Sequence, residues 1–69
     1  MSREITIEKN PDDPDSVFVW WRETIRGKPY GSHIKIPLPA TKSQILGATS
    51  TLERDANEKK CLVLAMVKP

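Results

Sequence analysis

The first half of the chain alternates between apolar and polar side chains, the pattern of strands that bury one face. In residues 3–9, isoleucines alternate with glutamate and threonine. Residues 16–26 are rich in β-branched and aromatic side chains, and residues 32–38 again place aliphatic side chains at every second position. Because successive side chains of a strand point to opposite faces, these runs predict three strands.

Two segments rich in turn-forming residues separate these strands. Residues 10–15 contain two prolines and four Asn or Asp residues, which predicts a loop. Residues 27–31 hold two glycines and a proline and are typical of a hairpin loop of about five residues. Pro37 has no amide hydrogen for a sheet ladder, so the third strand is expected to be an edge strand near its end.

A helix is predicted after the third strand. Thr41 and Gln44 have the spacing of a capping box, in which each side chain bonds the backbone amide of the other residue. Asn57 is a candidate C-terminal cap. An apolar stripe at helical spacing follows the capping box and consists of Ile45, Ala48, Leu52 and Ala56.

The apolar run at residues 61–67 is interpreted as a fourth strand, buried on both faces. Cys61 is then a small buried hydrophobic residue, and Met66 belongs to the core. The predicted fold is a single α+β domain over residues 1–69, with the order β-β-β-α-β. An antiparallel meander carries one helix on one face of a four-stranded sheet, and the last strand lies beside either the first strand or the third.

One helix covers only one face of such a sheet, and the second strand indicates which face stays open. The side chains expected to face the helix are Val17, Val19, Trp21 and Ile25, interrupted by Glu23. The opposite set is aromatic and basic: Phe18, Trp20, Arg22, Thr24 and Arg26. In the neighbouring strand, His33, Lys35 and Pro37 are expected to share this second face.

An open face of this composition predicts a contact surface, because tryptophan and arginine are enriched among interface hot spots. Aromatic rings beside cations also suit single-stranded nucleic acid. Alternatively, Phe18 and Trp20 lie flat under the loop at residues 10–15 or under arginine stems, as ordinary packing. The candidate binding residues on this face and the basic hairpin are Phe18, Trp20, Arg22, Arg26, Lys28, Tyr30 and Lys35.

Composition narrows the class of protein. The chain has 69 residues, of which 38% are hydrophobic and 29% charged, which is typical of one small globular domain. No apolar run approaches the roughly 18 residues that span a bilayer. A single cysteine excludes an internal disulfide and, with a single histidine, a structural zinc site. We therefore expect a cytoplasmic protein without cofactor or metal.

The net charge of +2 is unevenly distributed. Residues 1–15 carry two basic and five acidic side chains, whereas residues 16–42 carry five basic and one acidic. An acidic arm beside a basic middle can steer a charged partner, or the two can neutralise each other. The acidic side chains of residues 10–15 are a candidate mimic of nucleic-acid phosphates, although an acidic turn is more often simply solvated.

Catalytic chemistry has little support in the sequence. His33 is the only histidine, and no motif places a nucleophile beside it. Ser16, Ser32 and Ser43 are explained as loop and cap residues. Gly27 and Lys28 lack the rest of a phosphate-binding loop signature. We therefore expect a protein that is not an enzyme.

The N-terminal part resembles small phage-encoded anti-CRISPR proteins over about 28 residues. The features that carry the likeness are Met1-Ser2-Arg3, the strand through Thr6 and Ile7, Pro11 and Pro14 before Ser16, and the Arg26-Gly27-Lys28 turn. The resemblance implies a stoichiometric inhibitor in the cytoplasm of a host cell, bound to a larger host protein or ribonucleoprotein complex. No functional residue is carried over, because those proteins share no motif.

A second likeness is topological. Three strands followed by a helix resemble the arm-binding domains of phage integrases and double-stranded-RNA-binding domains. The latter have a lysine-rich helix start, where this chain has only Lys42. The sequence therefore predicts a small binding protein, with a nucleic-acid-binding module as the alternative. A homodimer that hides the open face is compatible with both.

Overall fold

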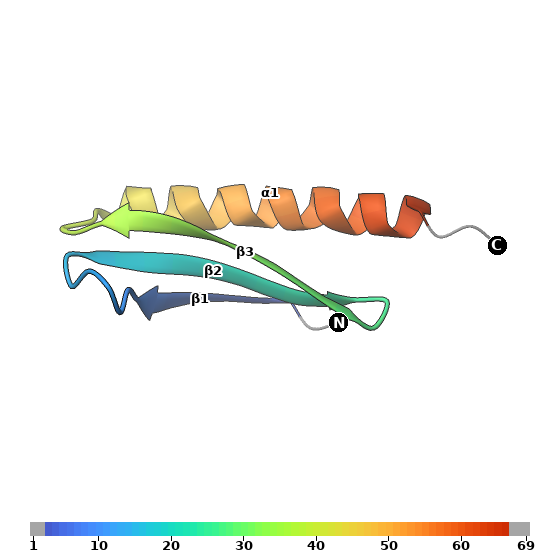
Figure 1. Cartoon of the computed structure of the whole chain (residues 1–69). Coiled ribbons are helices and arrows are strands. Elements are labelled where there is room, and N and C mark those ends of the chain that lie inside the picture. Colours follow the sequence, from blue (N-terminus) through green and yellow to red (C-terminus); the bar gives the residue numbers. More distant parts are fainter. Residues whose placement is uncertain (1–2, 67–69) are drawn as a thin grey trace.

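The computed structural model describes residues 3–66, which form three strands followed by one helix. The strands β1 (Glu4–Lys9), β2 (Ser16–Ile25) and β3 (Lys28–Pro37) form an antiparallel sheet in the order β1-β2-β3. The helix α1 (Lys42–Met66) lies along one face of this sheet (Figure 1). The predicted α+β class and the antiparallel meander are confirmed, and β3 is an edge strand as Pro37 indicated.

The predicted fourth strand is wrong. Residues 61–66 continue α1 without a break, so within the described residues the sheet has three strands. Val67, the last residue of the predicted strand, lies outside the described residues. No glycine or proline follows Gly47 before the helix ends, and leucine, alanine and methionine are strong helix formers. Asn57 is therefore an interior residue of α1 rather than its cap.

The hairpin between β2 and β3 is tighter than predicted. Its loop is Arg26-Gly27 alone, because Ile25 already pairs with Lys28. Both loop residues have positive φ, 52° and 80°, as a two-residue loop matching the strand twist requires. The segment from Lys28 to Gly31, expected in the loop, belongs to β3.

The strand register divides the side chains between the two faces of the sheet as the alternation predicted. Phe18 is paired with Lys35, and Trp20 with His33, so these four side chains share one face. Val19 and Trp21 point to the other face, where they pack against α1. We call the face away from α1 the open face.

The core is small and lies between α1 and the centre of the sheet. Val19 and Leu52 are fully buried. The helix packs on β2 and β3 and leaves the β1 edge less covered, so that Ile7 is 57% exposed. The other buried apolar side chains of this cluster are Trp21, Ile36, Ala48 and Ala56.

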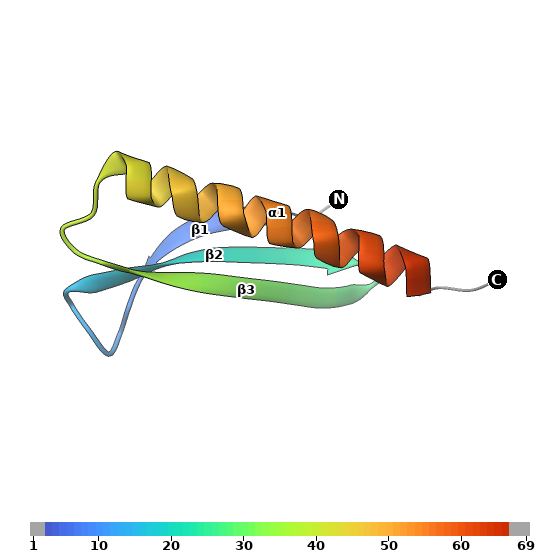
Figure 2. The ribbon, with the colours of Figure 1, turned by 90° about the horizontal axis from the view of Figure 1, so that it is seen from above.

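The helix begins at the predicted capping box. The Thr41 amide donates to the Gln44 side-chain oxygen at 2.7 Å, and the Gln44 amide donates to the Thr41 hydroxyl at 3.2 Å. Seen from above, α1 runs from the end of the sheet that carries the loop at residues 10–15 to the end that carries the hairpin (Figure 2). The two connections therefore lie at opposite poles of an elongated molecule, whose principal extents are 48, 23 and 16 Å.

The last turns of α1 expose apolar side chains. Met66 is 77% exposed and Cys61 is also exposed, so the predicted burial of both residues is wrong. The reason is that a strand there would have entered the sheet, whereas the helix touches the sheet with only one stripe. No helix in the described residues combines the length and apolar character needed to cross a membrane.

Candidate binding surfaces

Three aromatic rings cluster at the centre of the open face. The ring centroids of Trp20 and His33 are 4.5 Å apart with an interplanar angle of 35°, and Phe18 meets His33 edge to face at 4.9 Å. Phe18 and Trp20 are themselves 6.5 Å apart. All three positions come from β2 and β3, whose register sets them side by side. Phe18 and Trp20 are half-buried and His33 is exposed, so this aromatic cluster is accessible.

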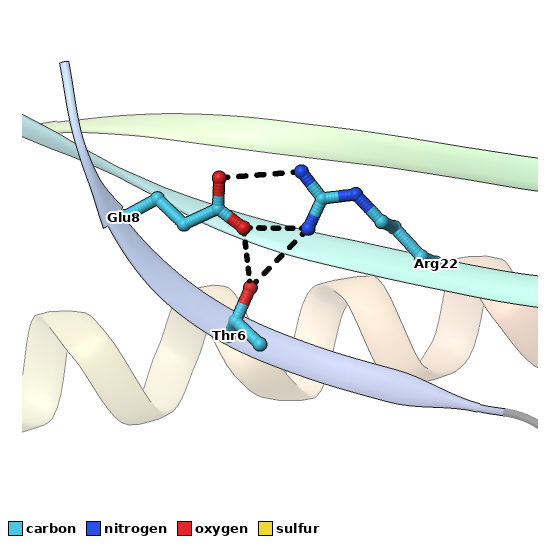
Figure 3. Close-up of polar contacts among 3 residues, drawn as sticks. All are labelled: Thr6, Glu8 and Arg22. Atoms are coloured by element: carbon cyan, nitrogen blue, oxygen red, sulfur yellow. Dashed lines mark hydrogen bonds and ion pairs between the residues drawn. The ribbon is translucent and has the colours of Figure 1, made fainter. Parts of the chain in front are cut away.

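Arg22 borders the aromatic cluster on the β1 side. Its guanidinium carbon lies 4.4 Å from the centre of the Trp20 ring, within cation–π distance. The same guanidinium donates two hydrogen bonds to Glu8, at 2.5 and 3.2 Å (Figure 3). The Thr6 hydroxyl donates to the same carboxylate at 2.8 Å. The Arg22 guanidinium therefore lies over the Trp20 ring, and Trp20 remains half-buried.

The contacts between Arg22 and Glu8 shift the pKa values of both side chains. Hydrogen bonds from Arg22, and secondly from Thr6, hold the pKa of Glu8 below its ordinary value. The bond to Glu8 in turn raises the pKa of Arg22. The pair stays charged at neutral pH and holds the Arg22 guanidinium in a fixed place beside Trp20.

The second cation of the open face is also paired. The Lys35 ammonium lies 3.7 Å from an Asp13 carboxylate oxygen. Asp13 is held by its loop, where its other carboxylate oxygen accepts the Asp15 amide at 2.9 Å. Asn10 fixes the same loop by donating to the Ser16 hydroxyl at 2.9 Å. The carboxylates of Glu8 and Asp13 thus offset both cations of this face.

The structure divides the predicted binding residues between three places. Phe18, Trp20, Arg22 and Lys35 lie together on the open face. Tyr30 lies on the opposite face, where it packs against the core, and the Lys59 ammonium is 5.5 Å from its ring centre. Arg26 and Lys28 lie at the hairpin, one in the loop and one at the start of β3.

At the hairpin, a cleft of about 270 Å³ opens between the sheet and the end of α1. We call it the hairpin cleft. Ile25, at its base, is 4% exposed. Its lining residues are Ile25, Arg26, Lys28, Tyr30, Val63 and Met66.

On the helix-facing side, a buried carboxylate ties the sheet together. Glu23 is 4% exposed and accepts hydrogen bonds from Arg3 at 2.8 Å and from the Trp21 indole at 3.0 Å. Burial alone would raise the pKa of Glu23, but the bonds from Arg3 and Trp21 outweigh it and lower the pKa below its ordinary value. Glu23, which interrupted the apolar pattern, is therefore a satisfied structural carboxylate.

Sequence reasoning missed the partners of the predicted residues. Glu8 and Asp13 complete the open face, and Val63 and Met66 complete the hairpin cleft. Alternation does place Glu8 on the face of Phe18 once β1 is aligned with β2, but the alignment itself is not legible in the sequence. The two helix residues were misplaced because their segment was assigned to a strand.

His33, the only histidine of the chain, lies among the aromatic rings of the open face. The contacts found for His33 are with the rings of Phe18 and Trp20, not with a hydroxyl or carboxylate. Within residues 3–66, no group of three or more His, Cys, Asp or Glu side chains is placed to hold a metal ion. The chemistry available here is stacking, ion pairing and apolar contact.

No family model matches the chain, and neither a curated protein nor a solved structure matches it.

Proposed function

We propose that the chain is a non-catalytic binding protein that contacts a larger protein through the aromatic cluster of its open face. The observation that carries the proposal is the accessible set of Phe18, Trp20 and His33 with Arg22 fixed beside it. Isolated domains seldom leave adjacent aromatic side chains uncovered, and tryptophan and arginine supply much of the binding energy of protein interfaces.

The charge balance favours a protein over a nucleic acid as the partner. Arg22 and Lys35 are each paired with a carboxylate, and Glu4 lies on the same face opposite Arg22. Phosphate binding draws its affinity from cations that replace counterions, and these two cations are already neutralised within the chain. A protein partner needs no such excess of positive charge.

The first test compares capture of partners by wild-type protein and by Trp20→Ser. Both proteins are immobilised and exposed to bacterial extract, and the proteins that each captures are compared by quantitative mass spectrometry. The protein most enriched on the wild type is then purified and titrated against both. We expect Trp20→Ser to weaken its binding by about 30-fold or more, the effect of removing a hot-spot residue.

Ile7→Ser is the matched control, because Ile7 is 57% exposed but lies on the helix-facing side of the sheet. It should bind the partner as the wild type does. Equal binding by all three proteins would contradict the proposal.

Tryptophan fluorescence tests the nucleic-acid alternative directly. Single- and double-stranded oligonucleotides are titrated at low and moderate salt. We expect no saturable change. A change that falls steeply with salt and is lost in Arg22→Ala would replace the protein partner by a nucleic acid.

A narrower form of the proposal follows from the resemblance of the N-terminal part to anti-CRISPR proteins. In that form the partner is a nucleic-acid-handling complex of a host cell, and the chain inhibits it by stoichiometric binding in the host cytoplasm. Expression in a bacterium whose CRISPR system restricts a test phage should restore plaque formation, and Trp20→Ser should not. If the phage stays restricted in strains with several CRISPR types, the inhibitor proposal is rejected. The general proposal of a protein-binding open face would then still stand.

A further inference from the structure

The hairpin cleft lies away from the aromatic cluster, at the pole of the molecule opposite the loop at residues 10–15. It forms because α1 runs on to Met66 and its last turns pass over the β2–β3 hairpin (Figure 2). Val63 and Met66 supply one wall, and Ile25 and Tyr30 supply the other. The cleft therefore lies between residues 28–31, which were predicted as part of a loop, and residues 61–66, which were predicted as a strand.

The cations of this cleft differ from those of the open face. Arg26 and Lys28 are exposed, and neither forms an ion pair with any residue between Arg3 and Met66. None of the six lining residues is acidic. The Lys59 ammonium over Tyr30 adds a third positive charge nearby. The cleft is thus an electropositive site with donors directed at no carboxylate of the described chain.

Arg26 occupies a backbone position that does not favour arginine. Its φ of 52° lies in the left-handed region, where glycine, asparagine and aspartate are preferred in two-residue hairpin loops. Residues held in such conformations are concentrated at binding and catalytic sites. Arginine at this position therefore carries a backbone cost that asparagine or glycine would avoid.

The cleft has the size and lining for one side chain rather than a whole cofactor. Its volume of about 270 Å³ is slightly below the range of roughly 300–1,000 Å³ usual for small-molecule sites. Aliphatic groups of Ile25, Val63 and Met66 suit an apolar side chain. The guanidinium of Arg26 suits a carboxylate, which it can bind with two parallel hydrogen bonds.

We propose that the hairpin cleft binds an acidic peptide segment in which carboxylates flank a large apolar side chain. The apolar side chain packs on Ile25, Val63 and Met66, and the carboxylates pair with Arg26 and Lys28. The inference rests on the proposed function in taking a protein as the partner, and it specifies the chemistry of a second contact on that partner. Nucleic acid fits less well, because Tyr30 is the one aromatic ring of the lining and already lies under Lys59.

The test is a titration of isotope-labelled protein followed by amide correlation spectra, with the Gly27 amide as the reporter. The probe is an N-acetylated, C-amidated peptide Asp-Glu-Leu-Phe-Glu. Two control peptides are Asn-Gln-Leu-Phe-Gln, without charge, and Asp-Glu-Gly-Gly-Glu, without apolar side chains. We expect saturable shifts at Gly27 with a dissociation constant of about 1 mM or tighter, and at least fivefold weaker binding of both controls.

Arg26→Asn is the decisive variant, because asparagine tolerates the left-handed conformation and keeps the turn while removing the charge. We expect roughly tenfold weaker peptide binding, as for loss of a charged hydrogen-bonding partner. The melting temperature should be unchanged or higher. Lys42→Gln, at the other end of α1, should bind the peptide as the wild type does.

Several results would overturn the inference. These are equal binding by Arg26→Asn, equal shifts from the uncharged peptide, or shifts confined to the open face. Tighter binding of a ten-nucleotide thymidine strand at Gly27 would also overturn it, by making the cleft a phosphate site. Trp20→Ser is expected to bind the peptide normally, so loss of this site and loss of the open-face function are separate observations.

Discussion

Two consecutive tryptophans experience opposite environments in this protein. Trp21 is 2% exposed, packs against α1 and donates its indole hydrogen to Glu23. Trp20 is half-buried on the other face, where its ring lies beside Phe18, His33 and Arg22. One residue contributes to the core and its neighbour forms a platform that solvent reaches.

The difference comes from strand geometry and from the number of helices. Successive side chains of β2 point to opposite faces, and α1 covers only one face. Both faces use a carboxylate bonded to an arginine, but Glu23 is buried, whereas the Glu8–Arg22 pair is exposed. The same chemical groups therefore stabilise the fold on one side and arrange a surface on the other.

The largest difference should appear when each tryptophan is truncated. Trp21→Ala should lower the free energy of unfolding by about 3–5 kcal/mol, because it opens a cavity in the core. A domain of 69 residues has about 3–10 kcal/mol in total. Trp20→Ala should cost about 1 kcal/mol or less. Chemical denaturation measures both, and equal losses would refute the assignment of the two faces.

If Trp21→Ala fails to fold, Trp21→Phe keeps the comparison measurable. The fluorescence of its remaining Trp20 should be quenched readily by acrylamide. In Trp20→Phe, the remaining Trp21 should resist quenching and emit at shorter wavelength.

Gly31 should be the next most sensitive position, although it lies on the open face. A Cβ there would sit 2.9 Å from the carbonyl oxygen of Trp21, closer than contact distance. Gly31→Ala should therefore cost about 1–3 kcal/mol through overpacking. Gly47→Ala is the control, because nothing lies within 4 Å of its added methyl group, and this change should stabilise α1 by about 0.5–1 kcal/mol.

The buried carboxylate predicts a dependence on pH. Because the folded-state pKa of Glu23 is lowered, its stabilisation is present above the ordinary value of 4.5 and is lost as the pH falls through the folded-state value. Glu23→Gln should cost about 1–2 kcal/mol at pH 7 and flatten the fall in stability below pH 4.5. Thermal melts from pH 7 to pH 3 measure this, and parallel curves for both proteins would contradict it.

The smallest effect is expected from the exposed pair. Like Glu23→Gln, Glu8→Gln removes a carboxylate whose pKa is lowered in the folded state. The Glu8–Arg22 pair, however, lies in solvent. The melting temperature of Glu8→Gln at neutral pH should stay near that of the wild type. Because Arg22 loses its ion-pair partner, the free energy of binding to the partner of the open face should change more than the free energy of unfolding does. A larger loss of stability than in Glu23→Gln would reverse the roles assigned to the two carboxylates.

Much of the fold could be predicted from the sequence because it depends on patterns among neighbouring residues. Alternation in β2 separated Trp20 from Trp21, and the spacing of Thr41 and Gln44 located the start of α1. Both are determined by neighbours within a few residues. The four predicted residues that share the open face were found for the same reason, since β2 and β3 are adjacent in the chain.

What the tertiary structure decided depends on contacts that no local pattern encodes. The run at residues 61–66 is apolar enough for a buried strand, yet it continues α1, whose last turns lie beside the β2–β3 hairpin. That continuation brings Val63 and Met66 to the hairpin and makes the cleft. Glu8 and Asp13 likewise meet Arg22 and Lys35 only after the strands pair, because both pairings join residues far apart in sequence.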